Sequence, residues 1–330
     1  MTMRTKPGLA RRGLLGAGAL VALPLPGLAQ TAAWPTRPIT IIVPFPPGGS
    51  TDNVARPIQM PLGAALGQNI VIENRGGAGA TIGIGAVAQA RADGHTLLIY
   101  ASAGMTISPH LMRLPYDVTR DFTQIALLAI SEGVVALNPK VPARTIQELV
   151  AYGRANPGAL RFGSAGNGTI TQMTGEIFAH AAGIRMEHVP YRGSAPALTA
   201  LLSGDIEMQF DPIAIPAIKD GRLRGIATTG ANRSQELPDL PTLRELGFWV
   251  EGGGGEAWFG MAGPAGLPPD VVQRLVAALP GILALPEVVR AMAPVGLRPV
   301  FEPPDVFARR IATDRALFGD AVKRTGATAQ

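Results

Sequence analysis

The sequence predicts an α/β protein. Three features support this class: short β-branched runs, turns rich in glycine and proline that follow them, and capped or amphipathic helices between them. The 330 residues are 47% hydrophobic and 16% charged, which supplies apolar material for two cores and excludes a disordered chain. The 41 glycines and 30 prolines follow no collagen period, so they are expected to mark loops.

The first predicted unit is a strand, a turn, a helix and a second strand. Residues 39–43 form a continuous β-branched run, which is typical of a strand buried on both faces. The proline- and glycine-rich residues 44–49 end this strand, and Ser50 or Thr51 can cap the helix that follows. Residues 70–73 are predicted as the next strand, which completes a βαβ unit.

The rest of the chain continues this alternation. A threonine followed three residues later by a glutamate predicts a helix start at Thr145 and at Thr242, because each side chain satisfies a free N–H of the first turn. Gly247 is expected to close the second one within a turn. Residues 270–279 place their valines and leucines on one helical face. Further strands are predicted at residues 96–101, 125–130, 134–137, 160–163, 206–210 and 223–228.

Residues 1–29 have the features of a secretory signal peptide. A basic start with Arg11 and Arg12 precedes the apolar run 13–23, and small residues fit cleavage near Ala29. The run is shorter than the roughly 20 residues that a helix needs to span a bilayer, so a membrane anchor is the weaker alternative. The paired arginines also fit a twin-arginine export signal, so Sec and Tat export both stay open.

The basic character of the chain belongs mostly to this leader. The formal net charge is +5, but residues 1–29 carry four basic and no acidic residues, which leaves 25 basic against 24 acidic groups. A nearly neutral mature chain lacks the electrostatic footprint of a nucleic-acid-binding protein. The absence of cysteine excludes disulfides, thiol catalysis and cysteine metal sites.

Enzyme and cofactor motifs are missing from the sequence. It contains no P-loop and no Gly-x-Ser-x-Gly, and the glycine run 76–83 does not match the dinucleotide fingerprint. The four histidines include no i,i+4 pair, so packing or surface roles are favoured over a metal site. We therefore expect no cofactor, no metal and no catalytic residue, although a dispersed pair of carboxylates stays open.

Two glycine-rich loops indicate an anion site. Residues 48–52 and 163–169 each precede a predicted helix. The start of a helix offers free N–H groups and the positive end of a dipole, worth about 0.3–2 kcal/mol for a nearby negative charge. The alternative for each loop is an ordinary connection between a strand and a helix.

A series of motifs runs in order along nearly the whole mature chain, from about Trp34 to the C-terminus. Each motif is weak alone, but together they closely resemble the substrate-binding proteins of tripartite tricarboxylate transporters, the Bug or TctC-like family. The motifs are WP at 34–35, VPFPPGGSTD at 43–52, ENRGGAG at 73–79, PYD at 115–117, GSAGNGT at 163–169, VPYRG at 189–193 and LPD at 237–239.

The resemblance implies a two-lobe periplasmic binding protein, of the Venus-flytrap, type II-like form, with two crossing strands. Lobe 1 would comprise residues 30–131 and 252–330 and be discontinuous, and lobe 2 would comprise residues 132–251. A small carboxylate would bind between the lobes: a dicarboxylate or tricarboxylate, an acidic amino acid or an aromatic acid. The loaded receptor, expected to be a periplasmic monomer, would deliver it to the membrane permease subunits of a tripartite transporter.

Other functions stay open beside this one. A receptor of the same fold could serve a sensor kinase instead of a permease, and a secreted enzyme could act on a carboxylate in the same cleft. An enzyme would need two titratable groups with separated pKa values, which no motif here supplies. A structural or adhesion protein is disfavoured, because such modules rarely need paired glycine-rich helix starts.

The family's binding residues transfer to this chain where the motifs match. In the first loop, Phe45, Gly49, Ser50 and Thr51 would grip one carboxylate, partly through backbone N–H groups. Asp52 is acidic, so we expect it to orient the helix start or to meet an ammonium group of an amino acid ligand.

Lobe 2 would supply the other contacts. Ser164, Asn167 and Thr169 would contact the ligand from the second glycine-rich loop, and Ser102 is a further candidate from lobe 1. The alternative is that each of these residues has only a structural role.

Three more residues are expected to border the cleft. Tyr191 and Asp211 follow strands of lobe 2, although Tyr191 could be a core aromatic and Asp211 a helix cap. Arg192 stands where the family usually has lysine, and it would change ligand choice if it points inward, because arginine binds carboxylates bidentately. The family's usual histidine-leucine pair is Gln172-Met173 here, which leaves the group at the far end of the ligand undetermined.

Overall fold

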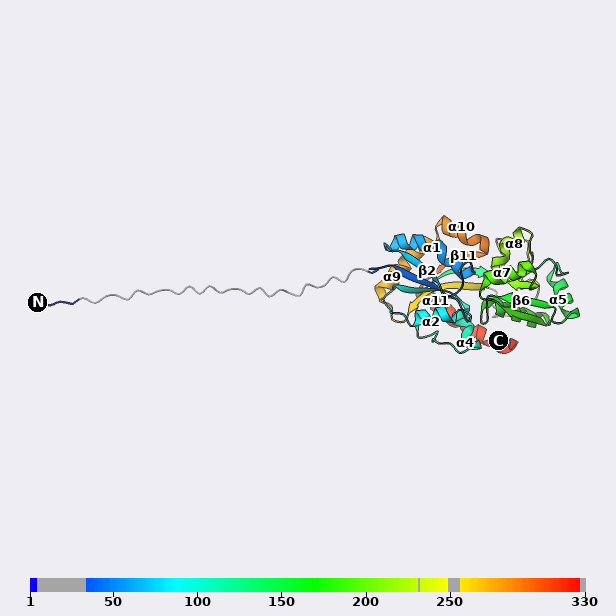
Figure 1. Ribbon diagram of the computed structural model, residues 1–330, viewed down its shortest axis with the longest axis horizontal. Coiled ribbons are helices and arrows are strands. Elements are labelled where there is room, and N and C mark those ends of the chain that lie inside the picture. The colour runs from blue at the N-terminus through cyan, green and yellow to red at the C-terminus, as the bar shows by residue number, and fades with distance from the viewer. Residues whose placement is uncertain (5–33, 231, 249–255, 327–330) are drawn as a thin grey trace. The chain divides into compact units, whose positions relative to one another are not determined.

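The computed structural model describes residues 1–4, 34–230, 232–248 and 256–326. The chain divides into residues 1–33 and a compact unit that begins at Trp34. The compact unit holds all the described helices and strands, which Figure 1 shows. Residues 5–29 of the predicted signal peptide, with its cleavage site, lie outside the described residues.

A six-stranded mixed sheet, in the order β11-β4-β10-β3-β1-β2, forms the core of the first lobe. Strands β1, β2 and β3 are parallel, whereas β10 runs antiparallel to both of its neighbours, β3 and β4. The predicted first strand is confirmed, and it is buried except at Thr40. The strands are β1 Ile39–Val43, β2 Ile70–Asn74, β3 Thr96–Ala101, β4 Phe122–Glu132, β10 Glu256–Pro264 and β11 Leu297–Glu302.

Helices cover both faces of this sheet, because successive side chains of a strand point to opposite faces. Ile41 packs in one cluster with residues of α1, α9 and α10, whereas Ile42 packs in another with residues of α2 and α11. The helices of this lobe are α1 Ser50–Leu66, α2 Thr81–Ala88, α3 Ala103–Thr106, α4 Ser108–Leu111, α9 Pro269–Leu283, α10 Pro286–Met292, η2 Ala293–Val295 and α11 Pro304–Thr325.

The amphipathic pattern near residue 270 is confirmed as part of α9. Val271, Leu275 and Leu279 are buried in the core of the first lobe, as their helical spacing predicts. Among the described residues, no single helix combines the length and apolarity needed to cross a membrane. The bent pair Pro269–Leu283 and Pro286–Val295, at 76°, meets these criteria jointly, by length and composition only.

A five-stranded sheet, in the order β7-β6-β8-β5-β9, forms the core of the second lobe. Strand β6 is parallel to β7 and β8, and β5 is antiparallel to β8 and β9. The strands are β5 Val134–Leu137, β6 Leu160–Ser164, β7 Met186–Pro190, β8 Met208–Phe210 and β9 Arg224–Thr228. The helices are α5 Ile146–Ala155, α6 Ile170–Ala182, α7 Ser194–Ser203, η1 Pro212–Ala214 and α8 Ile215–Lys219.

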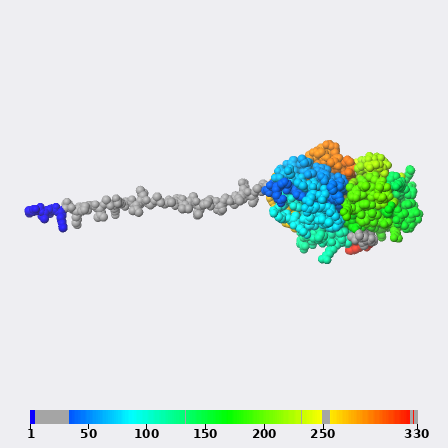
Figure 2. Space-filling model, in the orientation of Figure 1, coloured from blue at the N-terminus to red at the C-terminus, as the bar shows by residue number. Residues whose placement is uncertain are grey.

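The chain passes from the first sheet to the second between β4 and β5 and has returned to the first sheet at β10. Figure 1 accordingly shows the orange helix α10 beside the blue helix α1, with the green elements of the second sheet apart from them. In Figure 2 the blue and cyan residues meet the green residues along a boundary that crosses this face. The lobe limits near residues 131 and 252 stay a prediction, since residues 249–255 lie outside the described part.

The predicted helix start at Thr145 is confirmed, with one difference. The Thr145 side chain accepts a hydrogen bond from the Glu148 N–H at 3.1 Å, as a capping box requires. The Glu148 carboxylate accepts instead from the N–H of Arg144 at 2.7 Å, one residue earlier than expected.

The predicted capping box at Thr242 is confirmed, and the segment forms a single turn without a continuing helix. Thr242 and Glu245 exchange hydrogen bonds at 3.0 and 3.3 Å. Residues 243–247 nevertheless form only a turn, which ends at Gly247 in the left-handed region at φ +77°, and Thr242 itself pairs with Thr228 in an isolated β-bridge. Satisfied capping groups are therefore not enough to form a helix here, because the segment ends before helical hydrogen bonds can repeat.

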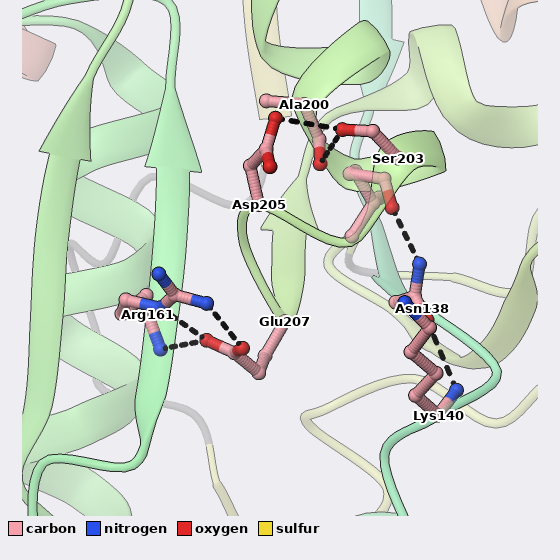
Figure 3. Close-up of polar contacts among 8 residues, drawn as sticks. Asn138, Lys140, Arg161, Ala200, Ser203, Asp205 and Glu207 are labelled. Carbon is pink, nitrogen blue, oxygen red and sulfur yellow. Dashed lines mark hydrogen bonds and ion pairs between the residues drawn. The ribbon is translucent and has the colours of Figure 1, made fainter.

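A bidentate ion pair ties β6 to the residue that precedes β8 (Figure 3). The Arg161 guanidinium donates to both Glu207 carboxylate oxygens, at 2.9 and 2.7 Å, and the Arg161 backbone N–H donates to one of them at 2.9 Å. Beside it, the Asn138 side chain donates to the Leu201 carbonyl at 2.8 Å. The Arg161–Glu207 pair holds β6, the strand whose carboxyl end begins the second glycine-rich loop.

We expect Glu207→Gln to lower the free energy of unfolding by up to about 1 kcal/mol at pH 7, because partly exposed ion pairs contribute little. Burial raises the pKa of Glu207, but hydrogen bonds from Arg161 outweigh it and hold that pKa below the ordinary value of 4.5. The stabilisation is therefore present above pH 4.5 and lost as pH falls through the lowered pKa. Urea denaturation at pH 7 and pH 3, with Arg161→Gln completing a double-mutant cycle, measures it. An equal loss at both pH values would contradict the assignment.

Candidate ligand-binding site

A cavity lies where loops at the carboxyl ends of strands from both sheets meet. The cavity volume is ≈ 50 Å³, which is enough for a few waters or for one carboxylate group. The crossing strands β4 and β10 close it from one side. The walls are Phe45, Gly49, Ser50, Thr51, Gly79, Ala80, Ala101, Ala103, Gly104, Ser131, Ala165, Thr169, Ile170, Thr171, Ser194, Asp211, Pro212, Ala257 and Phe259.

Four helices of eight or more residues begin at this wall. Ser50 and Ser194 are the first residues of α1 and α7, and Ala80 and Thr169 are the N-caps of α2 and α6. The first N–H groups of a helix have no acceptor within it, and the dipole there is positive. Among the described lining residues there is no lysine, arginine or histidine. Backbone and hydroxyl groups must therefore neutralise any anion in this cavity.

The loop before α2 has a strained backbone. Four successive residues, 77–80, have positive φ angles of 129°, 46°, 61° and 79°. Two of these residues, Ala78 and Ala80, are not glycine, and such residues rarely adopt this conformation. These strained residues lie where the loop borders the cavity and contacts the opposite lobe.

Four of the five residues predicted in the first loop line the cavity: Phe45, Gly49, Ser50 and Thr51. Asp52 does not line it. Its carboxylate accepts hydrogen bonds from the Gly48 N–H at 2.9 Å, Arg56 Nε at 2.6 Å and Asn74 Nδ2 at 3.0 Å.

The charge of Asp52 is used within its own loop. Burial raises the pKa of its carboxyl, but these three donors outweigh burial and hold the pKa below the ordinary value. Asp52 therefore stays ionised at neutral pH, and it fixes the turn that aims the start of α1 at the cavity.

In the second glycine-rich loop, Thr169 lines the cavity. Its hydroxyl donates to the Gly166 carbonyl at 2.6 Å and accepts from the Gln172 N–H at 3.4 Å, so it caps α6. The neighbouring Thr171 hydroxyl accepts from the Ala165 N–H at 2.9 Å. These bonds fix the loop with its backbone N–H groups at the wall.

Ser164 is fully buried and does not line the cavity. Its hydroxyl bonds to the N–H of Gly166 at 3.1 Å and to His188 Nε2 at 2.6 Å. The His188 ring stacks on Phe162 at 5.0 Å, and burial lowers its pKa to about 4, which keeps it neutral at pH 7. The Ser164 hydroxyl therefore bonds within its own loop and to the adjacent strand β7, and it does not face the cavity.

We expect Ser164→Ala to lower the free energy of unfolding of the ligand-free protein by about 1–3 kcal/mol, because it leaves buried polar groups without a partner. Thermal denaturation of residues 30–330 measures the change. Ser203→Ala, which alters an exposed serine of the same lobe, is the control and should change stability by less than about 0.5 kcal/mol. A loss of binding with unchanged stability would instead place the Ser164 hydroxyl on the ligand.

Asn167, Tyr191 and Arg192 line a second, outer pocket of ≈ 520 Å³. This pocket shares the walls Phe45, Gly79, Ala80 and Ala165 with the inner cavity. Ser102 lines neither pocket; it is buried between two lining residues of the inner cavity, and its N–H donates to the Trp258 carbonyl at 2.8 Å.

Asp211 is the one charged residue among the described walls of the inner cavity. It accepts hydrogen bonds from Ser194 Oγ at 2.5 Å and from the Ile213 N–H at 3.0 Å, and the nearby Ser50 side chain also acts to lower its pKa. Burial nevertheless raises the pKa of its carboxyl above the ordinary value. Because Ser50 begins α1, its contact with Asp211 joins the two lobes.

The lobes also touch at the mouth of the cavity. The Ser108 hydroxyl of the first lobe donates to the Gly168 carbonyl of the second at 3.3 Å. Gly79 lies so close to the Asn167 carbonyl oxygen that a Cβ atom would overlap it. Only a residue without a side chain fits there, so the structure shows the lobes in contact.

Sequence reasoning missed several lining residues. Ser194 follows Gly193 as Ser50 follows Gly49, so a search for repeated glycine–serine helix starts could have found it. Ser131 and Phe259 lie on the crossing strands, where no motif signals them. Among the described residues, no cluster of three histidine, aspartate or glutamate side chains could hold a metal ion.

Comparison with protein families identifies the relatives of this chain. Residues 54–326 match the model of the tripartite tricarboxylate transporter family receptor, TctC. Protein BugT of Bordetella pertussis is 34% identical over 328 residues, which cover 97% of this chain and 97% of BugT.

Solved structures agree with this relationship. The periplasmic binding protein BugD is 31% identical, with a TM-score of 0.83, over 90% of this chain and 100% of its own. Rpa4515 of R. palustris with adipate (31%, TM-score 0.84) covers 89% and 98%, and MatC of Rhodopseudomonas palustris with bound malate (30%, TM-score 0.80) covers 88% and 100%. The chain therefore belongs to the tripartite tricarboxylate transporter family receptors, the TctC family with the Bug proteins, which are solute-binding proteins of the periplasmic binding protein type.

Proposed function

We propose that this protein captures a small carboxylate between its lobes and delivers it to the permease subunits of a tripartite tricarboxylate transporter. One observation carries the ligand class: four helix N-termini meet at a cavity whose described walls include no cationic side chain. Such a site favours a compact anion that backbone N–H groups and hydroxyls can surround. The adipate and malate found in two relatives are anions of this kind.

The binding residues that we propose are those that face the cavity from opposite lobes. Ser50 and Thr51 would donate their backbone N–H groups from the start of α1, and Thr169 and Ser194 theirs from the starts of α6 and α7. The hydroxyls of Thr169 and Ser194 already donate to Gly166 and Asp211. A ligand held by both sides stabilises the closed arrangement over the open one, so binding and closure are one equilibrium. Nothing in this arrangement requires turnover of the ligand, and we propose binding without catalysis.

The signal peptide predicted at residues 1–29 suggests the compartment in which the protein acts. We propose that residues 1–29 direct export and are removed, so that a monomer acts in the periplasm beside the permease. The nearly neutral net charge of residues 30–330 fits a small-molecule receptor better than a partner for nucleic acid.

The test is a thermal-shift screen of residues 30–330. The panel holds mono-, di- and tricarboxylates, acidic amino acids and aromatic acids. A ligand present at a hundred times its Kd adds about 2.7 kcal/mol to stability, so a selective rise in Tm by one acid class supports the proposal. A flat panel, in protein that mass spectrometry shows to be free of retained ligand, would overturn the carboxylate assignment. Mass spectrometry of the recovered acid tests the absence of turnover.

A further inference from the structure

The inner cavity continues into the outer pocket. The two spaces share four wall residues, and the outer one is about ten times larger by volume, ≈ 520 Å³ against ≈ 50 Å³. The inner cavity has room for one carboxylate group, so the remainder of a larger ligand would extend past Phe45, which lines both spaces, into the outer pocket.

Charge is divided between the two spaces. Asp211 is the charged residue in the described walls of the inner cavity, and Arg192 is the charged residue in those of the outer pocket. The Arg192 side chain is exposed, and it has no hydrogen bond or ion pair to any described residue. An unpaired guanidinium at the mouth of an anion site can bind a second anionic group through paired N–H donors.

The local backbone fixes where Arg192 stands. The Tyr191 N–H donates to the Ser164 carbonyl at 3.1 Å, so this segment is held against the second glycine-rich loop. Two residues after Arg192, Ser194 lines the inner cavity. Two residues span at most about 7 Å between Cα atoms, so the backbone of Arg192 lies within the length of a short carbon chain of the inner cavity's wall. Phe45, which lines both spaces, and Met112, which lines the outer pocket, supply apolar surface.

We propose that the ligand is a dicarboxylate with an apolar spacer of several carbons, whose second carboxylate binds Arg192 in the outer pocket. This inference rests on the proposed function, since it assumes that the first carboxylate occupies the inner cavity. Arg192 then determines specificity: it separates dicarboxylates from monocarboxylates of the same length, while the helix starts bind the carboxylate that both share.

Calorimetric titration of two matched pairs of acids, adipate with hexanoate and succinate with butanoate, tests the proposal. The proteins are the wild type, Arg192→Gln, Arg192→Lys and the control Arg185→Gln. Arg185 is also exposed, and it precedes β7 whereas Arg192 follows that strand, so the control removes the same charge from the other end of the same strand.

We expect the wild type to bind adipate at least about tenfold more tightly than hexanoate, as a charge-assisted hydrogen-bonded pair provides. Arg192→Gln should remove this preference by weakening adipate alone, Arg192→Lys should keep part of it, and Arg185→Gln should change neither affinity. Equal affinity of the wild type for both acids, or an equal loss for both in Arg192→Gln, would overturn the inference and leave the carboxylate receptor standing. Failure of the wild type to bind any of the four acids would overturn the proposed function as well.

Discussion

Gly79→Ala is expected to weaken ligand binding by more than about a hundredfold, because it keeps the lobes from closing. The added methyl group would overlap the carbonyl oxygen of Asn167 on the opposite lobe. Closure brings the helix starts of both lobes onto the ligand, so a protein held open retains the contacts of one side only. Calorimetry measures the affinity, and small-angle scattering with and without ligand measures closure.

The control for Gly79→Ala is Gly67→Ala. Both glycines have left-handed φ angles, +61° and +72°, so both substitutions introduce similar backbone strain of about 1 kcal/mol. A Cβ atom at Gly67 meets nothing within 4 Å, so this variant should lose a little stability and keep full affinity. Equal effects of the two variants on binding would show that strain, and not the contact between lobes, is responsible.

Asp211→Asn is expected to raise the affinity for adipate at pH 7 by about tenfold. A buried carboxylate in the wall of an anion site repels the ligand, and one pKa unit corresponds to a factor of ten in affinity. Asparagine keeps an oxygen that can accept from the Ile213 N–H, so the local turn is retained. Adipate carries no ammonium group, so the variant removes no attractive contact from it.

The pH dependence has a definite sign. Burial raises the pKa of Asp211 above its ordinary value, so ionisation of Asp211 costs folding stability. The protonated carboxyl stabilises the folded protein below the ordinary pKa, and this stabilisation is lost as pH rises through the raised pKa. A bound anion raises that pKa further, so wild-type affinity should increase as pH falls through it. Asp211→Asn should flatten this profile. The exposed Asp205, which precedes β8 whereas Asp211 follows it, gives the control Asp205→Asn. Weaker adipate binding by Asp211→Asn at every pH would contradict the prediction.

Much of the fold could be predicted from local patterns. The run at β1, the glycine turn after it and the start of α1 follow from residues that act within one turn or one strand. The segment at Thr242 shows the limit of this reasoning, because its capping bonds form without a helix. Caps satisfy individual N–H groups, but the length of a helix depends on the residues and packing that follow.

The site was less predictable, for a physical reason. Ser164 was expected at the ligand because it begins a glycine-rich loop, yet its hydroxyl bonds to His188, which is 24 residues away in sequence. That pairing depends on the parallel register of β6 and β7, which no local pattern encodes. Lining residues such as Ala165 and Gly104 contribute backbone and shape, so their side chains carry no chemical signal.

The position of β10 also has consequences for how the molecule is made. Because β10 lies between β3 and β4, and β11 follows β10 in the chain, a chain synthesised only as far as β9 leaves one edge of β3 and both edges of β4 unpaired. The second lobe needs no later strand for its own sheet, so it can assemble while the first is still incomplete. This receptor is therefore expected to fold from the middle of its chain outward. Its first lobe would be the aggregation-prone part until β10 is in place.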